Sequence, residues 1–117
     1  MEYKILSLHK MAKGEPYRSC LVEAITTSAI ELRRAFGEPT YSTNKCSTEK
    51  VRYEWVFKVA YTKNGKDAEQ CFACIYDYKE YRRYGQYEQI EFHIGSNNND
   101  KDFVKALKEA IQMRINN

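Results

Sequence analysis

Tyrosines and basic side chains are concentrated between residues 76 and 87, where five of the chain's ten tyrosines lie among lysine and arginine. Tyrosine offers a large, stiff contact area at little entropic cost, and arginine offers planar, charge-assisted hydrogen bonds to carboxylates or phosphates. This mixture is typical of a surface that binds a partner. The predicted binding residues are Tyr78, Lys79, Tyr81, Arg82, Arg83, Tyr84 and Tyr87.

The sequence does not decide which target this segment binds, or whether its tyrosines are exposed. The target could be an acidic protein surface, a nucleotide or a single strand of nucleic acid, whose bases would stack on the tyrosines. Alternatively, the segment is a solvated hairpin whose tyrosines pack on neighbouring strands. A second basic segment could extend the patch if the fold brings it close, although a solvated loop is the simpler interpretation. It consists of Lys10, Lys13 and Arg18.

Asp77 and His93 are the one pair whose types suggest acid–base chemistry, because neighbouring strands can bring a carboxylate to an imidazole. No serine or cysteine lies in a recognisable nucleophile elbow, and the sequence has no glycine-rich phosphate loop or H-E-x-x-H helix. A structural hydrogen bond is the favoured role for this pair. We therefore predict a protein that is not an enzyme and has no catalytic residues.

Four cysteines raise the question of metal or redox chemistry. Cys71 and Cys74 match C-x-x-C, but they lie inside an expected strand, where residues three apart point to opposite faces. Metal and redox motifs need a turn or a helix start at that place, and the sequence has no second C-x-x-C. We predict reduced cysteines, with Cys71 and Cys74 as small buried hydrophobes, and no metal and no cofactor.

Composition limits the class of protein. The net charge of +3, from 19 basic and 16 acidic side chains, permits nucleic-acid binding without favouring it. No apolar run approaches the roughly 18 residues that span a bilayer, and the first residues do not resemble a secretory signal. The expected location is the cytosol or nucleus, and the length fits a single domain over residues 1–117.

The hydrophobic pattern predicts the strands that position these residues. Strict alternation from Val51 to Tyr61 predicts a strand in which Trp55 lies in the core or, alternatively, forms a stacking platform on an open sheet. Asn64-Gly65 then predicts a hairpin, since both residues tolerate positive φ. The next strand is apolar on both faces, as expected at the middle of a sheet or in an interface. Strands are expected at 3–8, 18–24, 51–61, 69–79 and 90–94.

Two helices are expected beside these strands. Ser28 and Glu31 match the S-x-x-E capping box of a helix that Gly37 and Pro39 end. Asp100 can cap a last helix, which carries an apolar stripe at helical spacing. The stripe consists of Phe103, Leu107, Ala110 and Ile111. We predict an α+β fold, an antiparallel sheet of four to five strands with two helices packed on one face; a mixed sheet with a helix on each side is the alternative.

Four short motifs carry a resemblance to a known family. They are Phe36–Pro39, Glu54-Trp55, Ile75–Lys79 and Phe92–Gly95. Their order resembles small uncharacterised domains of phages and large DNA viruses, in which F-G-x-P, E-W, I-Y-D-[WY]-K and [WF]-H-I-G follow one another. The resemblance covers residues 28–111 and carries over no catalytic residue. It implies a viral accessory protein of the kind that binds and blocks a host component.

The predicted function combines this resemblance with the Tyr/Arg-rich segment. We expect a non-enzymatic, viral-type accessory module that engages a host protein, and could inhibit it, through the segment and the neighbouring sheet surface. Nucleic-acid or nucleotide binding, with bases on tyrosines and phosphates on arginine and lysine, is the alternative. A homodimer through an uncovered apolar sheet face is also expected to be feasible. No membrane partner is expected, and a viral protein of this kind would act in the host cytosol or nucleus.

Overall fold

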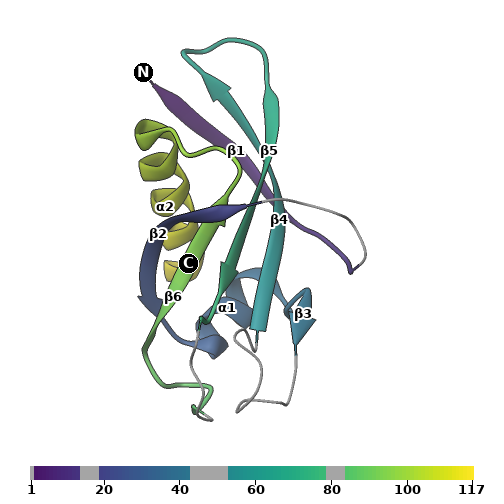
Figure 1. The fold of residues 1–117 in the computed structure, drawn as a ribbon, viewed down its shortest axis with the longest axis vertical. Helices are drawn as coiled ribbons and strands as arrows, with labels where there is room; N and C mark the ends of the chain where they lie inside the picture. Colours follow the sequence, from purple (N-terminus) through teal and green to yellow (C-terminus); the bar gives the residue numbers. More distant parts are fainter. Residues whose placement is uncertain (1, 14–18, 43–52, 79–83) are drawn as a thin grey trace.

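One antiparallel sheet and two helices make up the chain in a computed structural model that describes residues 2–13, 19–42, 53–78 and 84–117. The strands are β1 (Tyr3–Lys10), β2 (Cys20–Thr27), β3 (Tyr41–Ser42), β4 (Tyr53–Lys63), β5 (Glu69–Tyr76) and β6 (Ile90–Ser96), and the helices are α1 (Ala29–Phe36) and α2 (Lys101–Asn116). The strand order is β1-β4-β5-β6-β2, with β3 added on β4 (Figure 1). The α+β prediction is confirmed; the sheet has one strand more than expected because the two-residue β3 also pairs.

The β4–β5 hairpin forms as its turn sequence predicts. Asn64 and Gly65 both adopt positive φ, 55° and 72°, the conformation in which the turn twist matches the twist of the strands. The antiparallel register runs from Glu54 opposite Tyr76 to Tyr61 opposite Glu69. β5 lies in the middle of the sheet, as the apolar residues on both its faces predict.

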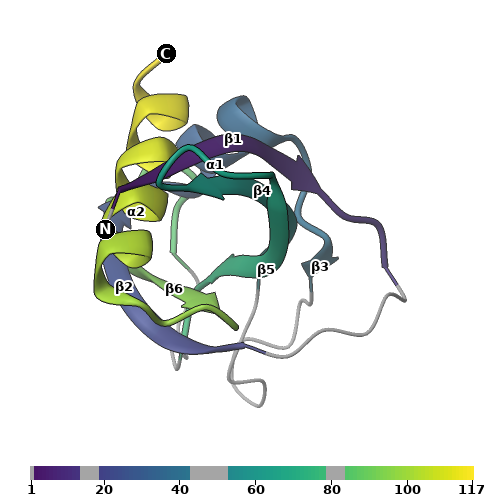
Figure 2. The same ribbon diagram turned by 90° about the horizontal axis from the view of Figure 1, so that it is seen from above.

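β2 takes the far edge of the sheet. It pairs with β6, so β1 and β2 lie at opposite edges although they follow one another in sequence. The sheet curls strongly, and α2 lies between its two edges (Figure 2), in contact with both β1 and β2. The helix therefore closes the open side of a curved sheet, and the concave, inner face of the sheet encloses the core.

Both helices begin at the predicted caps. Ser28 Oγ accepts from the Glu31 N–H and donates to Glu31 Oε1 at 2.8 Å, which completes the capping box. Gln89 Nε2 donates to the same Glu31 oxygen at 2.5 Å. Asp100 caps α2 through the N–H groups of residues 102 and 103. No helix in the described ranges is long and apolar enough to cross a membrane.

The core fills the space between the inner sheet face and the helices. Trp55 is fully buried and donates from Nε1 to the Gly37 carbonyl at 2.9 Å, so the predicted core position is confirmed and the stacking-platform alternative is wrong. Gly37 ends α1 with a φ of 82°, which favours glycine. The largest fully buried side chains besides Trp55 are Phe57, Phe92, Phe103, Leu32, Ile75, Ile94, Leu107 and Ile111.

Candidate functional site

The Tyr/Arg-rich segment leaves the sheet at a buried carboxylate. Asp77 is only 1% exposed; its Oδ1 accepts from the Tyr53 N–H at 2.9 Å and its Oδ2 accepts from the Tyr84 hydroxyl at 2.6 Å. A buried carboxylate needs such donors, because its desolvation would otherwise cost several kcal/mol. Asp77 thus has a structural role, with Tyr84 and Tyr53 as donors, whereas His93, the partner expected from the sequence, lies on the outer face beside Tyr76.

Tyr84 therefore does not belong to the surface. It is 4% exposed, and its ring packs edge-on against Tyr53 and Phe92 in the core. This corrects its place among the predicted binding residues: the buried Asp77 carboxylate requires the phenol hydroxyl inside the protein. Tyr87, in contrast, is 73% exposed. The remaining predicted residues of the segment lie outside the described residues. They are Lys79, Tyr81, Arg82 and Arg83.

The convex, outer face of the sheet carries a second, smaller apolar cluster. Met11, Val56 and Cys74 are buried there, and the rings of Tyr41, Phe72 and Tyr76 pack against them. Alternation explains the arrangement, since every second residue of β4 and β5 points away from the helices. The cluster has no helix over it among the described residues, so its aromatic rings are partly exposed to solvent.

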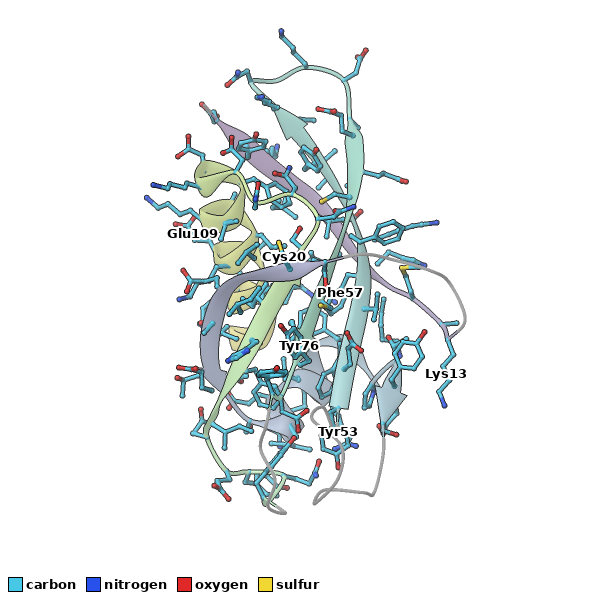
Figure 3. All side chains as sticks on the ribbon, in the orientation of Figure 1. Lys13, Cys20, Tyr53, Phe57, Tyr76 and Glu109 are labelled. Atoms are coloured by element: carbon cyan, nitrogen blue, oxygen red, sulfur yellow. The ribbon has the colours of Figure 1, made fainter. Side chains whose placement is uncertain are left out.

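Three more ring contacts join this cluster to Tyr78 and His93. The centroid of the Tyr76 ring lies 6.2 Å from that of Tyr78 and 5.6 Å from that of His93, and Tyr78 lies 5.5 Å from His93. Tyr78 is 40% exposed. Tyr76, labelled in Figure 3, is the last residue of the central strand β5. We call these rings the outer aromatic surface; its members are Tyr41, Phe72, Tyr76, Tyr78 and His93.

The charges beside these rings are mainly acidic. Glu91 Oε1 lies 3.5 Å from His93 Nε2, and Glu54 stands opposite Tyr76 in the register. Burial, with smaller effects of Cys74 and Glu54, raises the pKa of Tyr76 above its ordinary value. One cation, Lys58, stands opposite Phe72. In its described part, the outer aromatic surface therefore presents aromatic rings flanked mainly by carboxylates.

Acid–base chemistry finds no support in the positions of Asp77 and His93. His93 stands opposite Tyr76 and stacks on the outer face. Asp77 follows Tyr76 directly, and its hydrogen bonds lead to Tyr84 in the core. The two side chains of the predicted pair thus belong to opposite faces of the sheet.

The cysteines behave as the strand pattern predicts. Cys71 belongs to the inner core and Cys74 to the outer cluster, so the C-x-x-C residues point to opposite faces. Both are unbridged, and burial raises the pKa of each thiol to about 11. Cys20 is unbridged and exposed, whereas Cys46 lies outside the described residues. Within those residues no cluster of three or more metal-ligating side chains occurs.

The second basic segment is only partly described. Lys10 Nζ donates to the Glu38 carbonyl at 2.7 Å, next to the end of α1, and Lys13 is exposed. Arg18 lies outside the described residues. Lys10 thus has a structural role, and the contribution of this segment to a common patch stays a prediction.

No protein-family model, curated protein or solved structure matches the chain. The resemblance to phage and viral domains therefore stays a prediction, and the site is argued from its own residues. Of the five rings of the outer aromatic surface, only Tyr78 is among the binding residues that the sequence predicts; the four others are Tyr41, Phe72, Tyr76 and His93. The available signal is the apolar outer side of the strand expected at 69–79, which fits a covered face or an interface.

Proposed function

We propose that this chain is a non-enzymatic binding module that engages a protein partner through the outer aromatic surface, together with the Tyr/Arg-rich segment that follows Tyr78 in sequence. The observation that carries the proposal is the mutual packing of Tyr76, Tyr78 and His93 on a sheet face without a helix over it in the described residues. An antiparallel sheet normally presents polar side chains to water. Aromatic rings in that place favour a partner that buries them.

The charges favour a protein over a nucleic acid. Glu54 and Glu91 stand beside the rings, and carboxylates repel the phosphates that supply most of the affinity for nucleic acid. Tyrosine and histidine hydroxyl and ring N–H groups can instead donate to the backbone and side chains of a protein. Nucleic-acid binding remains the alternative, because Arg82 and Arg83 follow Tyr78 closely in sequence.

The resemblance adds the kind of partner to this proposal. A viral accessory domain would engage a host protein and could inhibit it by covering a functional surface. Asp77 is buried, and both its carboxylate oxygens accept hydrogen bonds inside the core, so this carboxylate has a structural role and is no part of the proposed binding surface. A homodimer through the same outer aromatic surface is the competing use of these rings.

Affinity capture from a host-cell lysate tests the proposal. Tyr78→Ala removes an exposed ring, and a Tyr81/Arg82/Arg83 triple-alanine variant removes the adjoining segment. Met113→Ala is the matched control, because Met113 is 67% exposed on α2 rather than on the outer face. We expect one or more proteins that survive nuclease treatment and bind Tyr78→Ala at least about 10-fold more weakly, since exposed aromatic anchors contribute about 2 kcal/mol or more.

Two results would sort the alternatives. Capture that disappears with nuclease, and falls steeply as salt rises, would assign the segment to nucleic acid. Equal capture by the wild type, Tyr78→Ala and the triple variant would refute the surface as the binding site. Sedimentation of the purified chain tests the homodimer, which Tyr78→Ala should weaken if the rings form it.

A further inference from the structure

The edge strand β2 presents backbone groups that the sheet does not use. In the described residues β2 pairs only with β6. Ala24 donates its N–H to Glu23 Oε1 at 2.9 Å, away from the β6 ladder. Successive residues of a strand turn their backbone groups to opposite edges, so residues two apart share an edge. The backbone groups of Thr26 therefore face the same open edge as those of Ala24. The edge therefore offers donors and acceptors for a further strand.

A groove runs along this edge, between β2 and α2. Its larger part, about 630 Å³, lies between residues 20–23 of β2 and the helix (Figure 3 labels Cys20 and Glu109 on its two walls). A second part of about 470 Å³ continues along Ala24 to Thr26. The two parts share Glu23, Lys108 and Gln112, so they adjoin. The hollow beside the other edge strand, β1, is smaller, at about 230 Å³.

The chemistry of the groove changes along its length. The helix wall of the larger part carries Lys101, Lys105 and Lys108, against the single helix carboxylate of Glu109. The far end, beside Thr26, carries Glu91. Exposed Leu21 and the half-buried Val22 and Val104 supply apolar lining in the larger part. A ligand with a carboxylate at the lysine end and an apolar side chain near Leu21 would complement these walls.

Glu23 already occupies the position of such a ligand. Its Oε1 accepts from the Ala24 N–H and lies 3.8 Å from Lys108 Nζ. One intramolecular carboxylate thus supplies both an acceptor for the strand edge and a negative charge for the helix wall. A peptide that pairs with β2 would replace it with a backbone carbonyl at Ala24 and a carboxylate at Lys108.

We propose that the groove between β2 and α2 binds an extended peptide from another protein, which adds a strand to β2 and places acidic side chains against Lys101, Lys105 and Lys108. Backbone pairing supplies the affinity in this mode of recognition, and alternate side chains supply the specificity. The lysines and the strand edge of the groove are not among the rings of the outer aromatic surface, and Glu91 adjoins both, so the two proposals are tested by different substitutions.

Selection from a displayed library of random ten-residue peptides tests this site. We expect selected peptides to alternate apolar and acidic residues and to bind Lys105→Glu at least about 10-fold more weakly, whereas Lys66→Glu, a charge reversal in the exposed β4–β5 turn, leaves binding unchanged. Ala24→Pro removes the edge N–H without removing a β6 ladder bond, because proline is tolerated at strand edges. It should abolish binding, and Tyr78→Ala should not affect it.

Several outcomes would overturn the proposal. A library that yields no peptide sensitive to Lys105→Glu or Ala24→Pro would show that the groove takes no such ligand. Glu23→Ala is expected to tighten peptide binding by removing the internal competitor. The proposal would also be wrong if no peptide binds and Glu23→Ala instead produces dimers that Ala24→Pro reverses. In that case β2 pairs with a second copy of this chain, and Glu23 prevents this pairing in the wild type.

Discussion

Replacing Tyr84 with phenylalanine tests the buried bond at the base of the Tyr/Arg-rich segment. The substitution keeps the ring and its packing on Tyr53 and Phe92, but it removes the hydroxyl that lies 2.6 Å from Asp77 Oδ2. Asp77 is 1% exposed, so water cannot easily replace the lost donor. Removing a hydrogen-bond donor from a buried acceptor costs about 1–3 kcal/mol, and more when the acceptor is charged.

We expect the free energy of unfolding of Tyr84→Phe to fall by about 2–3 kcal/mol, without loss of the fold, since domains of this size have roughly 5–15 kcal/mol of stability. In urea the unfolding midpoint should fall by roughly 1–2 M with an unchanged slope. Tyr87→Phe is the matched control; this tyrosine is 73% exposed, so the change should lie within about 0.5 kcal/mol.

A double-mutant cycle assigns the effect to the pair. Combining Tyr84→Phe with Asp77→Asn should cost less than the sum of the single changes, with an interaction energy of about 1 kcal/mol or more. A cost for Tyr84→Phe no larger than that of Tyr87→Phe would refute the reasoning, and so would strictly additive effects in the cycle.

Three further predictions concern the sheet and its helix cap. A Cβ at Gly95 would lie 2.8 Å from Cys74 Sγ, so Gly95→Ala should lower the free energy of unfolding by about 1–3 kcal/mol, and Cys74→Ala in the same chain should restore part of it; an unchanged urea midpoint in Gly95→Ala would contradict this. Because burial raises the pKa of Cys71 and Cys74 to about 11, only about a thousandth of each side chain is thiolate at pH 8. Iodoacetamide should therefore modify Cys20 in the folded protein and modify Cys71 and Cys74 only after unfolding, as read by peptide mass spectrometry. Rapid modification of Cys71 or Cys74 in the folded protein would contradict this. Hydrogen bonds from the Gln89 amide and then from Ser28 lower the pKa of Glu31 below its ordinary value of 4.5, so Glu31→Gln should be less stable than the wild type by roughly 0.5 kcal/mol at neutral pH. Unfolding curves should show this difference vanishing as the pH falls through the folded-state pKa of Glu31. A difference that grows in acid would contradict the last of these.

Local signals in the sequence predicted the local structure well. Asn64-Gly65 specifies a turn by its backbone preferences alone, and Ser28 with Glu31 satisfies the first N–H groups of a helix through neighbours in sequence. The alternating apolar residues from Tyr53 onward fix which face of β4 is buried. These features need no knowledge of distant contacts, so the α+β class followed from them.

Long-range contacts decided what the sequence did not predict. The pairing of β2 with β6 rather than with a neighbour in sequence depends on how the whole sheet curls around α2. Tyr84 and Tyr87 look alike in the sequence, yet the first is buried by its bond to Asp77 and the second is exposed. The hydrogen bond to Asp77 is what distinguishes the buried Tyr84 from the exposed Tyr87. In the sequence, Asp77 is only an acidic residue after an apolar run, so this bond was not predictable.

The outer aromatic surface likewise depends on elements far apart in sequence. Tyr41 belongs to β3 and packs against the outer cluster, and His93 belongs to β6 and packs against Tyr76. Both contacts depend on the order of the strands in the sheet. The pattern of β5 indicated an apolar outer side, but the rings that extend it were not predictable without the register.

Site-specific photo-cross-linking tests the central claim most directly. A photoreactive benzoylphenylalanine replaces Tyr78 on the outer aromatic surface, and in a second protein it replaces Met113 on α2, which is also well exposed. After illumination in a nuclease-treated host-cell lysate, we predict a discrete protein adduct at position 78 that is absent at position 113. No adduct at position 78, or the same adducts at both positions, would contradict the proposal that this surface binds a protein partner.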